Sequence, residues 1–515
     1  MWPGCGASTE TLPKVKLSEQ LPEQLTYLFE PRSIAVIGAS NVKIKWGYII
    51  PVNILAGGWK GELYPVNPGE TEILKRPCFK SVKEIEGDVD LAIVTVPAAC
   101  VARVVGECVQ KGVKTCLVIS SGFSEAGAEG MRLAEEVAGV VEGNGMRLVG
   151  PNTMGIYSGP ARLNAMMSPV RPAAGKIAFA AQSGNLGTQM LSIGKTLGVG
   201  FSRFVCIGNE TDLKVADYLQ YFARDPATEV ILLYIEGLKA ARRFIEVAME
   251  TSPKKPIVVL KAGKTKAGVR AAASHSAALA ADETIFRGVM KQTGMIEADT
   301  TEEMLDIAKA FAAVPLPRGN RVGVITWGGG WGVVMADALA RHSLELVELP
   351  QEIIRELDSF LPPYWSKGNP VDMVGTLDLS IHFRCLEIVS RCGCVDSVIS
   401  LGTIGMISSI QSFVLGDSTL DDVERGRTAT KVARSEFLKE IEKTDEAYRG
   451  EMLRLMQETR KPIIAVSFPA TGAVTPVLAS QSEVVIYPSP ERAAKALAAL
   501  CEYKKFLEQK CNTGA

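Results

Sequence analysis

The chain has 515 residues, of which 47% are hydrophobic and 22% charged, and its 56 Lys and Arg residues nearly balance 57 Asp and Glu residues. This length and apolar content exclude a disordered chain and indicate several folded domains. A net charge of -1 gives no reason to expect a nucleic acid or an anionic membrane as a partner. Apolar stretches stay short of the ~20 residues of a membrane span, and the first residues lack the pattern of a secretion signal.

The 11 cysteines are scattered along the chain. Cys100, Cys108 and Cys116 lie in apolar segments, which favours buried free thiols and a cytoplasmic protein. Cys392 and Cys394 are not spaced as zinc ligands, and no second pair of Cys or His completes such a site. We therefore expect no metal site built by this chain.

Strand-like apolar segments alternate with helical patterns after a polar arm over residues 1–30, which leads into a short helix. Continuous apolar strands joined by crossover helices indicate a parallel sheet that is covered on both faces. We place this first unit at 31–155. Its strands are expected at 33–38, 61–68, 91–97, 115–120 and 147–151, and its helices include 98–112 and 125–142.

The same pattern restarts after Pro172 and again after a Pro-rich linker at 315–319. The second series has expected strands at 176–180, 201–207, 230–235 and 256–260, helices at 186–196, 212–223, 240–250 and 281–293, and a glycine-rich loop over 262–280. The third has expected strands at 321–327, 397–401 and 462–468. We interpret the charged, helix-favouring stretch 416–459 as an inserted helical excursion on the surface.

The fold class that follows is α/β, with three successive Rossmann/flavodoxin-like units whose parallel sheets are covered by helices. The three units span 31–155, 156–315 and 316–515. The prediction rests on the alternation of apolar strands with helices. Ligands of such sheets bind at the carboxyl ends of the strands, so candidate site residues are sought there.

A glycine turn follows the first strand. Gly38, Ala39 and Ser40 form it, and Gly47 opens the next helix, an arrangement that lets backbone N–H groups approach a phosphate. The second strand ends at Asn67 instead of the acidic residue that binds the ribose of a nicotinamide dinucleotide. A nicotinamide-dependent oxidoreductase is therefore disfavoured. Another adenine nucleotide such as CoA stays open, as does a tight turn without a ligand.

A similar turn, Ser183-Gly184-Asn185, follows the first strand of the second unit and suits either anion binding or simple helix capping. Later in that unit His275 lies among small side chains, where a bulky group can reach it. Imidazole is a competent nucleophile toward an activated phosphoryl group. Glu236, at the end of a neighbouring strand, is available to orient the ring, whereas His342 and His382 are expected to be structural.

These segments together resemble the α subunit of the NDP-forming acyl-CoA synthetases, relatives of succinyl-CoA synthetase. The resemblance runs from about residue 28 to residue 500 and rests on six motifs in the family's order, at 31–40, 64–68, 121–125, 150–155, 182–187 and 273–276. It implies that 31–155 binds CoA, that 156–315 is a ligase domain with a phosphohistidine loop, and that 316–515 is a second flavodoxin-like ligase domain. The residues that we then assign to CoA are Gly38, Ala39, Ser40, Gly47, Asn67, Pro97 and Ser121.

The resemblance also implies chemistry through an acyl phosphate. Inorganic phosphate attacks the acyl thioester, His275 takes the phosphoryl group and releases the carboxylic acid, and the phosphohistidine passes it to ADP, each step being reversible. Glu236 matches the family's carboxylate partner of the histidine and would orient or deprotonate the imidazole. Backbone donors would hold the phosphate, and the residues assigned to this are Ser183, Gly184, Asn185, Ser274, Ser276 and Ala277.

No ATP-grasp domain follows the third unit of this sequence, and no G-x-x-x-x-G-K-[ST] loop replaces one. We therefore expect a hetero-oligomer with an ATP-grasp β subunit that binds ATP or ADP together with Mg²⁺. The loop reads Ser276-Ala277-Ala278 where the family often has Thr-Gly-Ser. The alternative from a different class is a CoA-binding regulatory or scaffold protein that kept the fold and lost the reaction.

Overall fold

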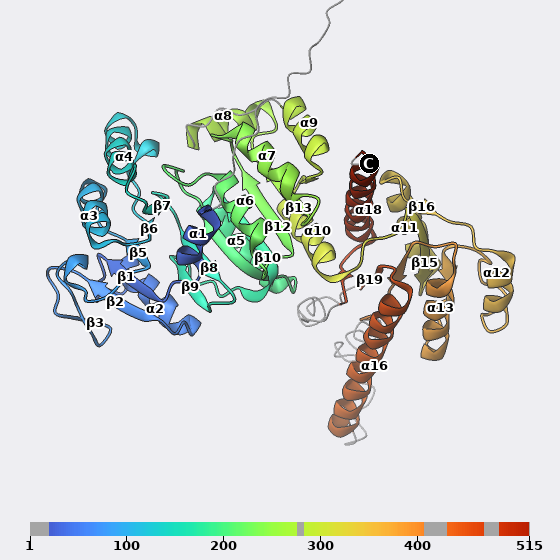
Figure 1. Ribbon diagram of the computed structural model, residues 1–515. Helices are drawn as coiled ribbons and strands as arrows, with labels where there is room; N and C mark the ends of the chain where they lie inside the picture. Colours follow the sequence, from blue (N-terminus) through green and yellow to red (C-terminus); the bar gives the residue numbers. More distant parts are fainter. Residues whose placement is uncertain (1–19, 276–282, 406–429, 468–483, 514–515) are drawn as a thin grey trace, which may run out of the picture.

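The computed structural model describes residues 20–275, 283–405, 430–467 and 484–513. Three sheets follow one another along the chain and are coloured blue to cyan, green, and yellow to red in Figure 1. Each sheet is flanked by helices, which confirms the predicted α/β fold class. Within the described residues, none of the helices combines the length and the apolar composition that crossing a membrane requires.

The first sheet has the strand order β2-β1-β5-β6-β7, and its strands are parallel. Strand order reverses between β1 and β5, so their carboxyl ends form the crevice where open α/β sheets bind ligands. The elements of the first unit are β1 (Ser33–Ile37), α2 (Trp46–Gly57), β2 (Glu62–Val66), β3 (Glu72–Ile73), β4 (Arg76–Pro77), η1 (Val82–Glu84), β5 (Leu91–Val94), α3 (Ala98–Lys111), β6 (Thr115–Val118), η2 (Ser124–Ala126), α4 (Ala128–Val141) and β7 (Arg147–Val149). Among them, β3 and β4 form a small antiparallel sheet of their own.

The second sheet has the order β14-β13-β12-β10-β11-β8-β9. The strands from β14 to β11 are parallel, but β8 and β9 form an antiparallel hairpin along one edge, so the prediction of a purely parallel sheet is wrong here. A hairpin needs no crossover helix and its short strands carry little pattern. The elements are β8 (Gly155–Ser158), β9 (Leu163–Met166), β10 (Ala173–Ala181), α5 (Gly184–Thr196), β11 (Gly200–Cys206), α6 (Val215–Arg224), β12 (Val230–Ile235), α7 (Ala241–Thr251), β13 (Ile257–Lys261), α8 (Lys266–His275), α9 (Glu283–Thr293), β14 (Ile296–Ala298) and α10 (Thr301–Ala313).

Helix α8 occupies the centre of the stretch 262–280, so the prediction of a loop there is wrong for 266–275. Thr265 starts the helix, because its Oγ1 accepts the N–H of Gly268 at 3.0 Å and its carbonyl accepts the N–H of Val269 at 2.8 Å. The alanine-rich sequence that follows favours the helical backbone. Residues 276–282 lie outside the described part of the chain.

The third sheet has the order β16-β15-β18-β19-β20, with β17 paired to β15, and its described strands are parallel. Its elements are β15 (Arg321–Thr326), α11 (Gly329–Arg341), β16 (Glu345–Leu346), α12 (Gln351–Asp358), β17 (Val371–Asp372), α13 (Leu379–Arg391), β18 (Ser397–Leu401), α16 (Thr430–Thr459), β19 (Ile463–Val466), β20 (Ile486–Tyr487) and α18 (Pro490–Thr513). Residues 406–429 and 468–483 lie outside the described ranges.

The second half of α16 belongs to the core of the third unit. Tyr448, Met452 and Leu455 are buried there. The Tyr448 ring meets Phe383 of α13 edge to face at a centroid distance of 5.3 Å, and its hydroxyl lies 3.0 Å from the Ser400 hydroxyl of β18. The interpretation of 416–459 as a surface excursion is therefore wrong for this half, which serves as the crossover helix between β18 and β19.

Helix α1 (Leu21–Phe29) ties the first two units together. Its buried face, which includes Leu25 and Phe29, belongs to one continuous apolar core with residues of both sheets. Phe29 stacks on Tyr221 of α6 at a centroid distance of 5.0 Å. The predicted short helix after the arm is thus present as a structural bridge, while residues 1–19 are outside the described residues.

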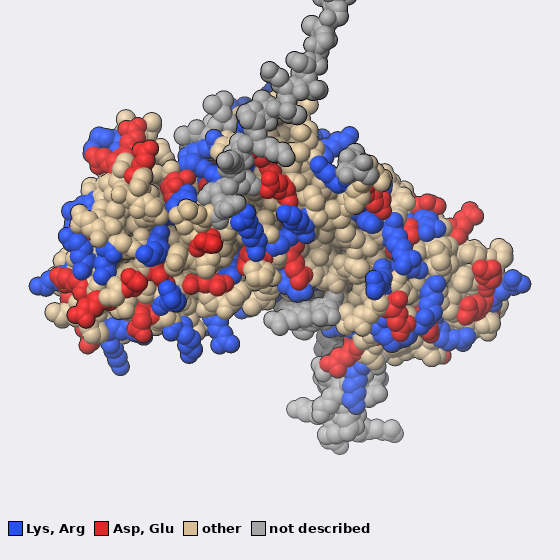
Figure 2. All heavy atoms as spheres, viewed as in Figure 1, with Lys and Arg blue, Asp and Glu red and all other residues tan. Residues whose placement is uncertain are grey.

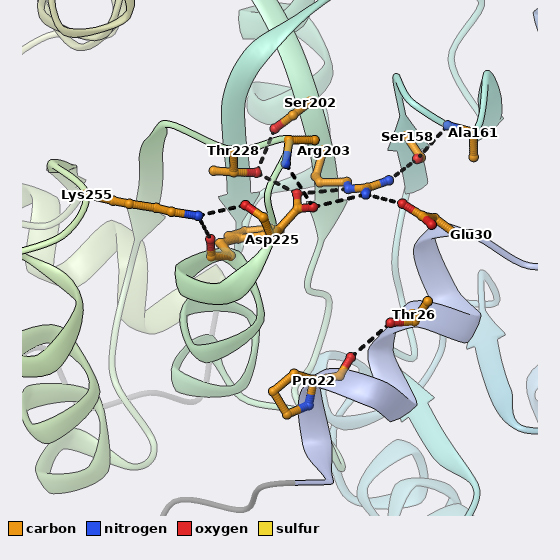
Figure 3. A network of polar contacts seen from close by, with 12 residues as sticks. Pro22, Thr26, Glu30, Ser158, Ala161, Ser202, Arg203, Asp225, Thr228 and Lys255 are labelled. Atoms are coloured by element: carbon orange, nitrogen blue, oxygen red, sulfur yellow. Dashed lines mark hydrogen bonds and ion pairs between the residues drawn. The ribbon is translucent and has the colours of Figure 1, made fainter.

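A buried arginine completes this junction (Figure 3). Arg203 of β11 is 1% exposed and donates to both carboxylate oxygens of Asp225, at 3.1 Å each. Its Nη1 donates to the Ser158 hydroxyl, and its Nη2, which also binds Asp225, donates to Glu30 at the end of α1. Thr228 donates to Asp225 at 2.6 Å. A guanidinium with its donors shared among three elements fixes their geometry more firmly than a single surface pair could.

The structure joins Cys392 and Cys394 in a disulfide whose Cα atoms are 5.4 Å apart. The expectation of free thiols throughout is therefore wrong at these two positions. They lie two positions apart directly after α13, and their Cα separation is within the range that a disulfide requires. The other described cysteines are free. Cys108 and Cys116 are also buried, as expected, whereas Cys100 is only partly buried.

Candidate functional site

A cavity of about 1040 Å³ lies where the first and second units meet, at the carboxyl ends of β1, β5, β6 and β10. It brings together two motifs that are far apart in the sequence, the turn after β1 and the turn after β10. The predicted residues that line it are Gly38, Ser40, Gly47, Asn67, Pro97, Ser121, Ser183, Gly184 and Asn185. Ala39, the remaining residue predicted to contact CoA, belongs to the same turn but is fully buried and is not among the residues that line the cavity.

The first turn requires both of its glycines. Gly38 has φ of +88°, and a Cβ atom there would lie 2.7 Å from the Thr95 hydroxyl. A Cβ atom on Gly47 would lie 2.0 Å from the carbonyl oxygen of Gly38. The start of α2 therefore packs directly on the turn, which is the close approach that small residues permit.

Several polar groups of this turn are bonded within the protein. The N–H groups of Gly38 and Ala39 both donate to the Val66 carbonyl, at 2.9 and 3.3 Å. The Asn67 side chain donates to the Ala39 carbonyl at 2.8 Å and accepts the N–H of Gly69 at 2.9 Å. Asn67 therefore locks the turn at the position where a dinucleotide enzyme would place its ribose-binding acid.

Three cations that the sequence reasoning missed line the same cavity. They are Lys45 at the start of α2, Lys80 before η1 and Arg103 on α3. Arg103 also pairs with Glu107 at 2.6 Å. The three are separated in sequence and form no run of charge, so only the fold brings them together. Exposed ammonium and guanidinium groups at a cavity rim suit the phosphates of a nucleotide.

Acidic and basic side chains are interspersed over the face of the molecule drawn in Figure 2. A broad positive surface is not seen on that face. Charge that favours an anion in the cavity is therefore supplied by local groups such as Lys45 and Arg103. Among the described residues, no group of three or more His, Cys, Asp or Glu side chains could hold a metal ion.

The second turn places the first turn of α5 at the cavity. Ser183 is the N-cap residue of this helix, and it has extended backbone angles without a side-chain capping bond. A Cβ atom on Gly184 would lie 2.1 Å from Cγ of Met154, so the helix start packs on the chain that leaves the first unit. Helix N-termini favour negative charge, and this one faces the same space as the first turn.

Gln182, which precedes that turn, connects the cavity to the end of β12. Its Oε1 accepts the N–H groups of Glu236 and Gly237 at 2.5 and 3.1 Å. Its Nε2 donates to the Gly237 carbonyl at 2.7 Å and to Glu210 at 3.0 Å. Gln182 belongs to the sequence motif 182–187, but the sequence indicates no role for it, because its partners come from two other loops.

Glu236 itself is 8% exposed, at the first position after β12. The Tyr234 hydroxyl donates to its Oε1 at 3.4 Å. Burial, together with the neighbouring carboxylate of Glu236, raises the pKa of Tyr234 to about 12. Tyr234 therefore remains a neutral hydrogen-bond donor to this carboxylate at physiological pH.

His275 is the last described residue of α8. The α8 segment leaves the end of β13, whose last residue Lys261 pairs in register with Ile235, directly before Glu236. The side chains of Ser274 and His275 are not among the described atoms, and Ser276 and Ala277 lie outside the described residues. That the His275 side chain faces Glu236 therefore stays a prediction. It is supported by the adjacency of the ends of β12 and β13.

The other two histidines have structural surroundings. His382 is fully buried, with its ring nitrogens 3.0 Å from the Thr403 hydroxyl and 3.0 Å from the Thr376 carbonyl. Burial lowers the pKa of His382, so the ring is neutral. His342 is the C-cap residue of α11, but burial and the nearby cations, Lys495 first among them, lower its pKa.

Three known domain families match successive parts of the chain. A CoA binding domain matches residues 32–158, a succinyl-CoA ligase like flavodoxin domain matches 174–311, and a ligase-CoA domain matches 322–411. These matches correspond to the three sheets in chain order.

Similar proteins are known from archaea. Subunit alpha of ADP-forming acetate–CoA ligase II of Pyrococcus furiosus is 44% identical over 377 residues, which is 73% of this chain and 82% of the relative. Subunit alpha of ligase I of the same organism is 36% identical over 489 residues, covering 94% and 98%. The structure of dinucleotide forming acetyl-coenzyme A synthetase 1 of Ca. Korarchaeum cryptofilum, with phosphate and ADP, has a TM-score of 0.81 at 32% identity, covering 95% of this chain and 99% of that chain.

Proposed function

The chain belongs to the ADP-forming acyl-CoA synthetases, which are acid–thiol ligases, and we propose that it is the α subunit that carries their phosphoryl relay. The reaction interconverts acyl-CoA, phosphate and ADP with a carboxylic acid, CoA and ATP. The observation that carries the proposal is the single cavity that joins the turn after β1 to the turn after β10. A nucleotide thioester and a phosphate could meet in it.

CoA would lie across the first unit with its phosphates near Lys45, Lys80 and Arg103. Its thioester would then reach the start of α5, where Ser183 and Gly184 line the cavity. A phosphate oxygen attacks the thioester carbon, the C–S bond breaks, and CoA leaves as a thiolate that takes up a proton. The helix N-terminus stabilises the phosphate and the charge that develops on the thioester oxygen.

His275 would take part in the next step. An imidazole nitrogen attacks phosphorus, the bond between phosphorus and the acyl oxygen breaks, and the carboxylate leaves. Glu236 would accept or orient the ring proton as the phosphohistidine forms. An ADP oxygen then attacks the same phosphorus and regenerates the free histidine. Each bond made is balanced by one broken, so the sequence runs in either direction.

A second subunit would supply the nucleotide. Both relatives from Pyrococcus furiosus are named as α subunits, which supports a partner chain. We propose that this partner is an ATP-grasp β subunit that holds ADP or ATP with Mg²⁺. The substrate class on this chain is a small carboxylic acid with its CoA thioester, and acetate is the first acid to assay because the two relatives are named acetate–CoA ligases.

The test is to mix the protein with acetyl-CoA and radiolabelled phosphate and to measure label on the chain. Phosphohistidine is acid-labile and base-stable, so the label should disappear in acid and survive base. The variant His275→Asn should carry no label, whereas the matched variant His342→Asn should label as the native protein does. Addition of the β subunit and ADP should discharge the label as ATP.

Two results would contradict the proposal. Equal labelling of the native protein and His275→Asn would exclude this histidine as the phosphoryl carrier. Tight CoA binding without label, for acetyl-CoA and a panel of longer and aromatic acyl-CoAs, would favour the regulatory or scaffold protein instead.

A further inference from the structure

The side-chain amide of Gln182 uses all of its hydrogen-bonding capacity on two loops of the second unit. Its oxygen accepts from the N–H groups of Glu236 and Gly237, and its nitrogen donates to the Gly237 carbonyl and to a Glu210 oxygen. A glutamine amide offers two donors and an acceptor with two lone pairs, so four partners complete it. The reverse orientation would place the NH₂ group against two N–H donors. The arrangement therefore has one stable orientation.

We propose that Gln182 is a positioning residue that fixes the peptide carrying Glu236, and so sets where that carboxylate can meet His275. The inference deepens the proposed function, because Glu236 acts on the histidine there. Gln182 lines the cavity, but each of its four bonds goes to protein groups. Glu236 follows β12 directly, so its N–H group lies just beyond the last strand residue, Ile235. The side-chain oxygen of Gln182 accepts two successive N–H groups at this strand end.

Glu210 anchors the glutamine in turn. It is 4% exposed and has φ of +54°, an unfavourable conformation for a residue with a Cβ atom. One of its oxygens accepts from Gln182, and the other accepts the N–H of Val215 at the start of α6, at 2.9 Å. A strained turn that places a buried carboxylate on an amide nitrogen persists only where the surrounding structure holds it.

The neighbouring residue extends this support to the CoA-binding unit. Asn209 donates to Glu125 at 2.5 Å, and Glu125 accepts the N–H groups of Gly122 and Phe123 at 2.7 and 3.2 Å. The Lys239 ammonium donates to the Asn209 carbonyl at 2.6 Å. The turn that holds Gln182 is thus bonded to the loop beside Ser121, which lines the cavity.

The test compares Gln182→Met with Gln220→Met in the assembled enzyme. Methionine keeps the length of the side chain and removes all four hydrogen bonds. Gln220 is a matched control, since it is a buried glutamine of the same unit that accepts from Arg243 and lies on α6. The first readout is amide hydrogen exchange of the peptide covering 235–238, measured by mass spectrometry. Exchange at Glu236 and Gly237 should rise about tenfold or more in Gln182→Met and stay unchanged in Gln220→Met.

The second readout is the rate at which radiolabelled phosphate enters the chain from acetyl-CoA. Gln182→Met should label about tenfold more slowly, with CoA affinity unchanged. In a Glu236→Gln background the same substitution should cause no further loss, because its effect passes through Glu236. The double variant Gln182→Glu with Glu210→Gln exchanges the two side chains. The new glutamate can still accept both N–H groups, and the new glutamine can donate the hydrogen bond that joins the two side chains. The double variant should recover most of the rate lost in Gln182→Glu alone.

These readouts separate the two proposals. Unchanged amide exchange in Gln182→Met overturns the positioning role, whatever the enzyme does with phosphate. Independent, multiplicative losses in the double variant with Glu236→Gln also overturn it. Faster exchange in Gln182→Met, together with a native protein that takes up no label, would instead overturn the phosphohistidine mechanism and leave Gln182 as a purely structural residue.

Discussion

Asp306 of α10 and Arg492 of α18 form a two-pronged ion pair, with Nε–Oδ2 at 2.5 Å and Nη2–Oδ1 at 2.8 Å. The pair joins the second unit to the helix that also packs on α11 of the third. Asp306 is 5% exposed, and its carbonyl accepts the Tyr487 hydroxyl at 2.7 Å. Removing one member would leave the other charge in a site that water hardly reaches, and this is costly.

We therefore expect Arg492→Met to lower the free energy of unfolding by about 2 kcal/mol, a value reduced from that of a fully buried pair because Arg492 is partly exposed. The measurement is a urea titration that follows tryptophan fluorescence. Lys504→Met is the matched control, since Lys504 pairs with Glu508 within one helix, and such surface pairs contribute less than about 0.5 kcal/mol. Equal effects of the two substitutions would contradict a special role for the Asp306 pair.

Asp225 makes the junction around Arg203 sensitive to acid. Burial has the largest single effect on its carboxyl and raises the pKa, but hydrogen bonds from Arg203 and Thr228 together outweigh burial and hold the pKa below its usual value. The ionised form is thus favoured in the folded protein. This contribution to stability is present above the unfolded pKa, near 3.8, and is lost as the pH falls through the folded one.

The free energy of unfolding should therefore fall less steeply below about pH 4 in Asp225→Asn, because the variant lacks the carboxyl that takes up a proton on unfolding. The measurement is the free energy of unfolding as a function of pH for the two proteins. Identical slopes would show that the Asp225 carboxyl does not titrate differently in the folded and unfolded chains.

His382 gives a second pH dependence with a different window. Burial lowers its folded pKa below the usual 6.5, so the unfolded chain binds the proton more readily. Stability from the neutral ring is complete above about pH 6.5 and declines as the pH falls through the folded pKa. His382→Gln should remove that part of the decline. Thermal unfolding midpoints between about pH 7 and pH 5 test it, and a decline of the same size in the variant would contradict it.

Gly47 is expected to be indispensable to the cavity. A methyl group there would lie 2.0 Å from the Gly38 carbonyl oxygen, so Gly47→Ala must move the start of α2 or the turn after β1. We expect a loss of about 1–3 kcal/mol in stability and a loss of CoA affinity, measured by calorimetry. Gly139→Ala in α4, where a Cβ atom meets nothing within 4 Å, should gain about 0.5–1 kcal/mol and bind CoA normally.

The longer strands of the three sheets could be predicted because they are apolar and separated by helix-length segments. The short strands β14, β16, β17 and β20 were not expected, since two or three residues carry too little pattern. The strand expected at 33–38 is one residue longer than the observed β1, and every residue of β1 is buried. The hairpin β8–β9 could not be foreseen in this way, since its pairing with β11 depends on a chain reversal that leaves no helical period in the sequence. Helix α8 was hidden for a related reason, because its many small residues are equally typical of a loop.

Site residues that belong to one local turn could be predicted from the sequence. Gly38 and Gly47 combine a strand end with a helix start, and they do pack together. Lys80 and Arg103 could not be predicted as site residues, because the cavity is lined by side chains from elements that are far apart in the sequence. Gln182 shows the same limit. Its neighbours in sequence are the α5 turn, but its function depends on Glu210 and Glu236, which approach only in the folded sheet.

Helix α18 gives the protein a particular order of assembly during translation. Residues 490–513 leave the ribosome after every other described element, yet they cover α10 of the second unit and α11 of the third. The Tyr503 hydroxyl even donates to Ser252, which follows α7, at 2.6 Å. A nascent chain can complete the first two sheets early, but the apolar side of α10 waits for this last segment. Chaperones that bind exposed apolar helices would meet the chain during that interval.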